Sequence, residues 1–186
     1  MADLLQWLAE AGLELHNVLI AAPTTVEDAG RALFIARRIP VKTLIVQATT
    51  PRDTAKATEK LAVLARPLGV TITIDSASMS PIGSVAHFVE ANPDTGLGIC
   101  LDVASAQKQG DLMEAIEIVA EHVAAVRIPV EGPAGGIDWP SVLTTIQKVG
   151  YDGALMFDGV GRGSTKEALA RAKAAREKME RWLTSI

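Results

Sequence analysis

The sequence predicts an α/β protein in which parallel β-strands alternate with α-helices. Six short runs of β-branched or aliphatic residues recur along the chain, and their starts are spaced by roughly 26 to 30 residues, about one strand–helix unit. The segments between them have amphipathic patterns with recognisable helix starts. Strands joined through single helices run parallel, with right-handed crossovers.

The six strands are expected at residues 13–20, 43–47, 71–75, 98–102, 124–128 and 154–158. Proline or a capping side chain opens the helices that follow. Pro51 and Pro81 stand in predicted first turns, Asp138 precedes Trp139, and Ser164 precedes the last helix. The short connections and the absence of a linker indicate one domain, residues 1–186.

The alternation of side chains along the strands separates two faces. One face carries large aliphatic and aromatic residues, as expected beneath a layer of helices; these are Ile72, Ile74, Ile99, Leu101, Val126, Ile128, Leu155 and Phe157. The other face carries small or polar residues such as Thr73, Cys100 and Ala125. This second face lines either the middle of a barrel or a second helix layer of an open sheet.

Polar side chains of this second face end five of the six strands: Gln47, Asp75, Asp102, Arg127 and Asp158. The carboxyl ends of parallel strands meet on one side, where (β/α) barrels hold their active sites. Three neighbouring carboxylates require a proton, an arginine or a cation, and Mg²⁺ or Mn²⁺ prefers such oxygen ligands. The alternative is that each Asp caps the helix or turn that follows it.

A glycine-rich loop follows Asp158 and leads into the last helix. Its residues Gly161, Arg162, Gly163 and Ser164 are candidates for binding phosphate or substrate, because helix N-termini and arginine both bind anions. The alternative is a flexible turn. The spacing matches neither a P-loop nor a dinucleotide-binding fingerprint, so no nucleotide cofactor is expected.

Composition narrows the class of protein. The formal net charge is −4, and without a basic stripe nucleic acid is not the expected partner. No apolar run has the roughly 18 residues that span a bilayer, and the N-terminus does not resemble a signal peptide. A single cysteine fits the reducing cytoplasm. We therefore expect a cytoplasmic globular protein whose partner is neither nucleic acid nor a membrane.

Two segments carry a family resemblance. The run Gly96-Leu-Gly-Ile-Cys-Leu-Asp102 looks like a metal-binding strand, and Gly136-Ile-Asp-Trp followed by Gly150-Tyr-Asp-Gly looks like a C-terminal signature. Together they resemble the xylose-isomerase-like TIM barrels of the sugar-phosphate isomerase/epimerase family, over nearly the whole chain. The resemblance implies a (β/α) barrel of the TIM type that is incomplete or pared down. About six parallel strands remain, because the family's first two have no counterpart. A partner would then cover the edge near residues 13–20, making a homo-oligomer.

The resemblance also implies roles for residues. Asp75, Asp102 and Asp158 would hold a divalent metal, with Asp replacing the family's Glu at the first and last of these positions. Those three, Arg127 and Glu131 would form the catalytic set. Three positions depart from the family, which has histidine there; in this sequence they are Gln47, Ser105 and Arg127, and the first two become candidates for contact with substrate or phosphate.

The implied function is a metal-assisted isomerase or epimerase of a small sugar, sugar phosphate or hydroxy-carbonyl compound. Two alternatives remain open. Arg127 and Ser105 favour a non-catalytic barrel that binds or assembles and has lost the metal site. A metal-dependent phosphodiesterase of the endonuclease IV type is the other alternative, against which the acidic net charge and the missing histidines count.

Overall fold

The computed structural model describes residues 2–20, 26–39, 41–48, 51–130, 136–158 and 163–184. Six parallel strands form one sheet in chain order. Their bounds are β1 (Asn17–Leu19), β2 (Thr43–Val46), β3 (Thr71–Asp75), β4 (Gly98–Asp102), β5 (Val123–Pro129) and β6 (Leu155–Asp158). The predicted fold, an incomplete (β/α) barrel of about six parallel strands, is confirmed.

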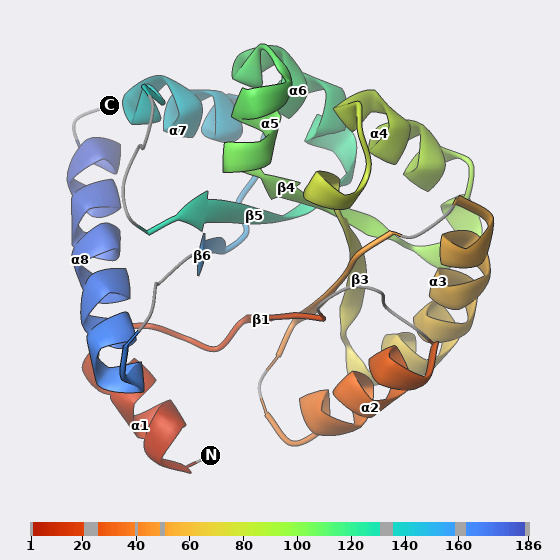
Figure 1. Ribbon diagram of the computed structural model, residues 1–186, viewed down its shortest axis with the longest axis horizontal. Coiled ribbons are helices and arrows are strands. Elements are labelled where there is room, and N and C mark those ends of the chain that lie inside the picture. The colour runs from red at the N-terminus through yellow and green to blue at the C-terminus, as the bar shows by residue number, and fades with distance from the viewer. Residues whose placement is uncertain are drawn as a thin grey trace.

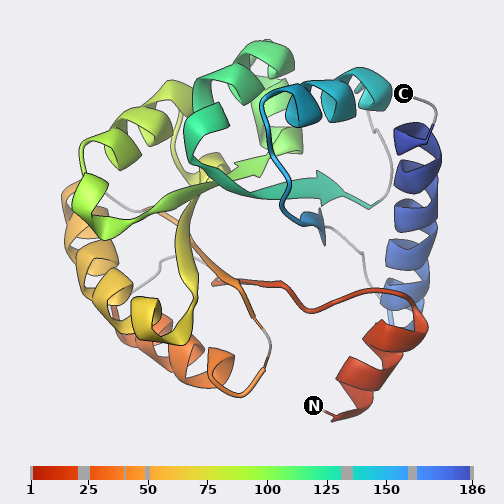
Figure 2. The same cartoon turned by 180° about the vertical axis from the view of Figure 1, so that it is seen from behind.

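Helices surround these strands (Figures 1 and 2). They are α1 (Ala2–Glu10), α2 (Val26–Ala36), α3 (Pro51–Ala65), α4 (Ile82–Glu90), α5 (Val103–Gln109), α6 (Leu112–Val119), α7 (Trp139–Lys148) and α8 (Thr165–Leu183). Short 3-10 turns lie at Arg66–Leu68, Ser76–Ser78, Pro93–Thr95 and Ala120–His122. The predicted helix starts at Asp138 and Ser164 are confirmed, because each side chain accepts a backbone N–H of the first turn. Among the described residues, no helix combines the length and apolar character needed to cross a membrane.

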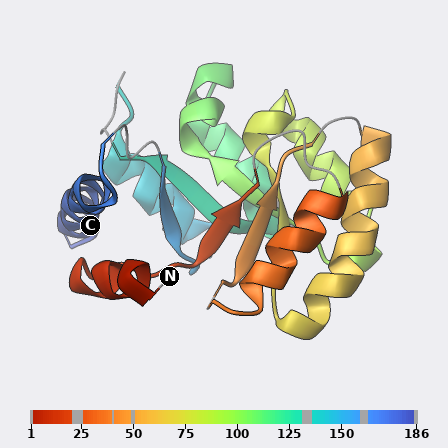
Figure 3. The ribbon, with the colours of Figure 1, turned by 60° about the horizontal axis from the view of Figure 1, so that its bottom comes forward.

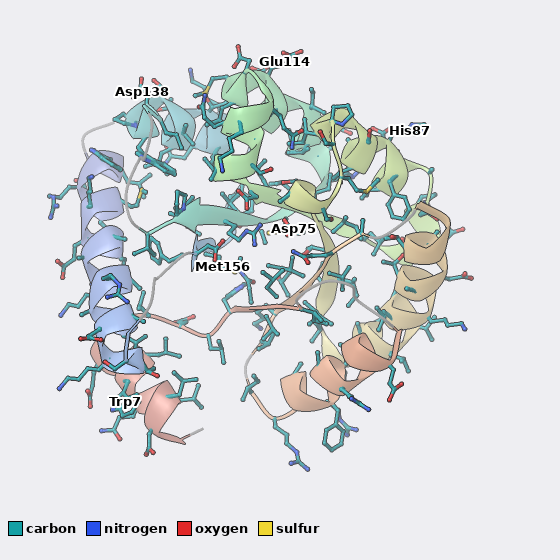
Figure 4. The ribbon with its side chains drawn as sticks, in the orientation of Figure 1. Trp7, Asp75, His87, Glu114, Asp138 and Met156 are labelled. Atoms are coloured by element: carbon teal, nitrogen blue, oxygen red, sulfur yellow. The ribbon has the colours of Figure 1, made fainter. Side chains whose placement is uncertain are left out.

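The two faces of the strands bury different side chains. The aliphatic face joins the helices in the main core, which includes Ile74, Leu101 and Ile128. The opposite face forms a separate small cluster of Ile45, Cys100 and Ala125, with Met156 packed against it. In Figure 4 Met156 lies inside the ring of helices. The small face therefore lines the middle of a barrel, which settles the choice that the sequence left open.

The barrel is open between its first and last strands. Strand pairing runs from β1 to β6 and, within the described residues, does not join β6 back to β1. Helices α1 and α8 lie side by side at this seam (Figure 3), where Arg176 Nη1 donates to the carbonyl oxygen of Gly12 at 2.7 Å. A cavity of about 520 Å³ lies there, lined by residues of α1, α8, β6 and the stretch before β1.

The first strand is shorter than predicted. Pairing with β2 covers only Asn17–Leu19, whereas the prediction began at residue 13. Leu13 and Leu15 instead line the cavity at the seam. Residues are held in a sheet only where a neighbouring strand offers backbone partners, and β2 begins opposite Asn17.

Candidate functional site

Four charged side chains lie at the carboxyl ends of the last four strands. Asp75 ends β3, Asp102 ends β4, Arg127 lies near the end of β5, and Asp158 ends β6. The sheet register places Asp102 beside Arg127. Figure 4 shows Asp75 near the middle of the ring of helices, whereas labelled residues such as His87 lie on its outside. The four residues that share one strand face in the sequence therefore lie together in the structure.

The guanidinium of Arg127 lies between the carboxylates. Its Nη2 is 3.1 Å from both Oδ atoms of Asp75 and also donates to Oδ2 of Asp102. Its Nη1 is 3.6 Å from Oδ2 of Asp158. The Asp75 side chain is 0% exposed, whereas that of Asp158 is 50% exposed. The network therefore runs from the barrel interior to the surface, and Asp158 is its outermost member.

Asp75 is the most deeply buried acid of the site. Besides Arg127, it accepts the backbone N–H of Ala77 at 3.2 Å and Nε2 of Gln47 at 3.4 Å. Burial raises the pKa of Asp75 above its ordinary value, although Arg127, Ala77 and Gln47 act in the opposite direction. Asp75 consequently retains a proton to a higher pH than an exposed aspartate does.

Asp102 links the site to α5. Its Oδ1 accepts the backbone N–H of Ser105 at 2.7 Å, and its own N–H donates to the Ser76 hydroxyl at 2.8 Å. Asp102 therefore caps a helix and contacts Arg127 at once. Asp75 likewise caps the turn that follows it through Ala77. Asp75 and Asp102 thus each cap the turn or helix that follows and also belong to the acidic cluster around Arg127.

Arg127 is a permanent cation with spare donors. Burial acts to lower its pKa, but the three carboxylates more than offset that effect and raise the pKa above the ordinary value. Its Nε–H is buried without a hydrogen-bond partner among the described residues. Nη1 lies at an ion-pair distance of 3.6 Å from Asp158. This distance is longer than the 3.1 Å from Nη2 to the Asp75 oxygens.

The other predicted site residues lie around this network. Gln47 follows β2 and reaches Asp75. Ser105 contributes its backbone N–H, and its hydroxyl accepts Nε2 of Gln109 at 3.3 Å. Gly163 precedes Ser164, which caps α8. Glu131, Gly161 and Arg162 lie outside the described residues.

Ser76 and Ser78 are the parts of the site that sequence reasoning missed. The Ser78 hydroxyl donates to the carbonyl oxygen of Asp75 at 2.6 Å and accepts the backbone N–H of Ala48 at 2.8 Å. Ser76 holds the backbone of Asp102. These hydroxyls tie the ends of β2, β3 and β4 together. The detectable signal was a serine-rich turn directly after a strand-end aspartate, where hydroxyls commonly bond to nearby backbone.

The acids do not fit a divalent metal while Arg127 holds this position. Among the described residues, no group of three histidine, cysteine, aspartate or glutamate side chains is placed to hold a metal ion. Carboxylate oxygens are suitable ligands for Mg²⁺ or Mn²⁺, but here the guanidinium lies among them and bonds to the oxygens that would coordinate the ion.

Comparison with known proteins shows which solved structures share this fold. No family model and no curated protein sequence matches the chain, but solved structures do. A sugar phosphate isomerase/epimerase from Parabacteroides distasonis is 15% identical with a TM-score of 0.70, and the match covers 97% of this chain and 76% of that one. The 3-keto-D-glucoside 4-epimerase of E. coli is 12% identical with a TM-score of 0.73, over 94% of this chain and 81% of that one.

A third solved structure is described as a xylose isomerase-like TIM barrel from Mycobacterium smegmatis in complex with magnesium. It is 16% identical with a TM-score of 0.71, over 96% of this chain and 76% of that one. The chain shares the TIM-barrel fold of these proteins. The resemblance inferred from the sequence is thereby confirmed for the fold. Because a shared barrel fold does not fix the activity, function has to be argued from the site itself.

Proposed function

We propose that this protein is an isomerase or epimerase of a small sugar, sugar phosphate or other hydroxy-carbonyl compound, acting at the carboxyl ends of the barrel strands. The observation that carries the proposal is the pairing of a half-exposed carboxylate, Asp158, with a buried permanent cation, Arg127, 3.6 Å away. Such reactions need a base that removes a proton beside a carbonyl group and a positive group that stabilises the resulting oxyanion.

The fold supports this proposal. Solved structures with the same architecture include a sugar phosphate isomerase/epimerase and a 3-keto-D-glucoside 4-epimerase. TIM barrels carry their active sites on the face where the four charged side chains of this chain meet. Glu131 and the loop residues Gly161 and Arg162 belong to the proposal as further candidates for contact with the ligand.

Proton exchange tests the function. The protein is incubated in D₂O with neutral ketoses and aldoses and with their phosphates, with and without Mg²⁺ or Mn²⁺, and loss of the C–H signal beside the carbonyl is followed by NMR. We expect exchange with at least one compound and its loss in Asp158→Asn. The matched control is Asp152→Asn, an exposed aspartate ahead of β6, which should behave like wild type. Absence of exchange under every condition would contradict the proposal.

The family resemblance seen in the sequence implies a metal-assisted form of the reaction. In this chain Mg²⁺ or Mn²⁺ would have to be held by Asp75, Asp102 and Asp158, and Arg127 would have to withdraw from them. Elemental analysis of the purified protein addresses this form directly. A stoichiometric divalent ion would support it.

One observation favours a non-catalytic alternative. Asp75 and Asp102 are both occupied by the guanidinium of Arg127, so the site could serve only to hold the ends of the strands together in a binding or assembly protein. Exchange that depends on Asp158 separates the two functions, because a purely structural network predicts none.

The cellular compartment and the oligomeric state belong to the same proposal. The single cysteine, Cys100, is buried in the barrel, where burial raises its pKa to about 12, so it is suited to packing and not to redox chemistry. We place the protein in the cytoplasm because a single cysteine cannot form an internal disulfide, which fits a reducing compartment. We also propose a homo-oligomer in which a second copy covers the open seam.

A further inference from the structure

We infer that Arg127 takes the place of a divalent ion in this site, and that the protein binds an uncharged hydroxy-carbonyl compound between Arg127 Nη1 and Asp158. The inference rests on the proposed function and specifies its electrophile and its substrate class. It follows from the different partners of the two terminal nitrogens of Arg127, from the charge of the site and from the capping of the α8 N-terminus by Glu167.

The two terminal nitrogens of Arg127 have different roles. Nη2 is engaged by buried partners, with both Asp75 oxygens at 3.1 Å and Asp102 beside them. Nη1 points toward Asp158, at an ion-pair distance of 3.6 Å. A ligand oxygen can therefore accept a hydrogen bond from Nη1 while Asp158 accepts one from a neighbouring hydroxyl or removes a neighbouring proton.

The two buried aspartates that hold the guanidinium are themselves fixed by backbone N–H groups. Asp75 is fixed by the N–H of Ala77, and Asp102 by the N–H of Ser105, at 3.2 and 2.7 Å. Withdrawal of Arg127 would leave two buried carboxylates without their cation, which is strongly unfavourable. A metal ion would have to displace the guanidinium against this cost, whereas a neutral ligand can leave the bonds of Nη2 to Asp75 and Asp102 in place.

The charge of the site selects an uncharged ligand. Three carboxylates and one guanidinium leave a formal charge of −2, or −1 when Asp75 holds its proton. A phosphate or carboxylate at this position would meet a net negative charge.

The first turn of α8 is already occupied by an anion. The backbone N–H and the hydroxyl of Ser164 donate to Oε2 of Glu167 at 2.7 and 3.1 Å, and these bonds lower the pKa of Glu167. A helix N-terminus that could hold phosphate is thus satisfied by a carboxylate of its own helix. This argues for a ligand without a phosphate group.

The chemistry balances without a co-reactant. Asp158 takes the proton from the carbon beside the carbonyl, the C–H electron pair forms a C=C bond, and the carbonyl pair moves onto oxygen, where Nη1 of Arg127 stabilises the enediolate. The hydroxyl proton passes to that oxygen, and Asp158 returns its proton to the former carbonyl carbon. The ketose and the aldose interconvert with no net gain or loss of protons or electrons.

Exchange into D₂O after exhaustive EDTA treatment tests the inference. The probes are dihydroxyacetone, glyceraldehyde and fructose, each beside its phosphate ester. We expect exchange with a neutral probe that survives EDTA and is not increased by Mn²⁺. Arg127→Lys keeps the charge but loses the forked donor and should lower exchange by about 10²-fold. Asp158→Asn, at a half-exposed position, should abolish exchange without affecting folding.

The outcomes separate the two claims. Exchange that requires Mn²⁺, or that occurs only with the phosphate esters, would overturn the inference and leave the proposed function standing. Exchange unchanged in Arg127→Lys, checked to be folded by circular dichroism, would also overturn it. Absence of exchange with every probe, with and without metal, would overturn both the inference and the function on which it rests.

Discussion

Arg127 decides the character of the site, because its side chain contacts all three of the strand-end aspartates. Its guanidinium joins two buried aspartates to a half-exposed one. A buried ion pair of this kind gives little net stability relative to an apolar pair, but removing one partner leaves an uncompensated charge. This asymmetry predicts what happens when Arg127 is removed.

Replacing Arg127 with alanine should destabilise the protein by about 3–5 kcal/mol, since Asp75 and Asp102 lose their buried cation. Added Mn²⁺ should restore part of this loss in the variant, because the freed carboxylates can then bind the ion. The free energy of unfolding in urea, with and without Mn²⁺, measures both effects. Arg31→Ala is the control: its ion pair with Glu27 is exposed, and its loss should change stability by about 0–1 kcal/mol. Equal effects of the two substitutions, with no response to Mn²⁺, would mean that the acids do not share a site.

The pKa of Asp75 predicts a pH dependence of stability. Burial raises this pKa above 3.8, so the folded state retains the proton to a higher pH than the unfolded state. The contribution of Asp75 to the free energy of unfolding should therefore be greatest below that value and fall as pH rises through the window above it. Urea titrations of wild type and Asp75→Asn across this range give the difference curve. A difference that grows with pH would show that Arg127 outweighs burial.

Among the helices, α8 carries the clearest local signals. Ser164 and Glu167 form a reciprocal capping box at its start. Trp182 near its end stacks on Trp139 of α7, with ring centroids 6.3 Å apart and planes inclined by 10°. The cap fixes where the helix begins, and the stacked rings fix the side on which it packs. Helix α8 thereby covers one side of the seam.

Removing the cap should weaken this element measurably. Ser164→Ala deletes the hydroxyl that accepts the N–H of Glu167 and should cost about 1 kcal/mol. Thermal and urea unfolding provide the readout. Thr165→Ala is the matched control, because it also deletes an exposed hydroxyl in the same turn but leaves the box intact; its stability should equal or slightly exceed that of wild type. If the two variants lose the same stability, the capping box does not hold the helix.

The molecule as a whole is a barrel with an open seam. Among the described residues, β1 and β6 each pair on one side only, and apolar side chains line the cavity of about 520 Å³ between α1, α8 and β6. Parallel strand edges and apolar surface of this kind are normally covered. The proposal of a homo-oligomer depends on this feature.

Oligomerisation through the seam makes a concentration-dependent prediction. Light scattering coupled to gel filtration should give a mass above that of the monomer, and Leu15→Asp, within the cavity lining, should shift it toward the monomer. Leu64→Asp is the control, because Leu64 is already exposed on α3. A monomeric wild type over a wide concentration range would exclude this arrangement.

Much of this protein is determined by the sequence alone. Alternation along a strand is local, so the facing of Ile74 and Leu101 toward helices, and of Asp75 and Asp102 toward one site, could be inferred from parity. Helix starts at Asp138 and Ser164 were equally local, because a cap bonds within its own first turn.

Only the tertiary structure decided the rest, because it depends on contacts between residues far apart in the chain. Whether the small face lines a barrel, where the pairing of β1 stops, and how Ser78 joins β2 to β3 each require neighbouring strands to be in place. The position of the Arg127 guanidinium is the decisive case. The sequence showed one cation among three acids, but long side chains have many rotamers. Burial against Asp75, 52 residues away, selects the one that fills the centre of the site.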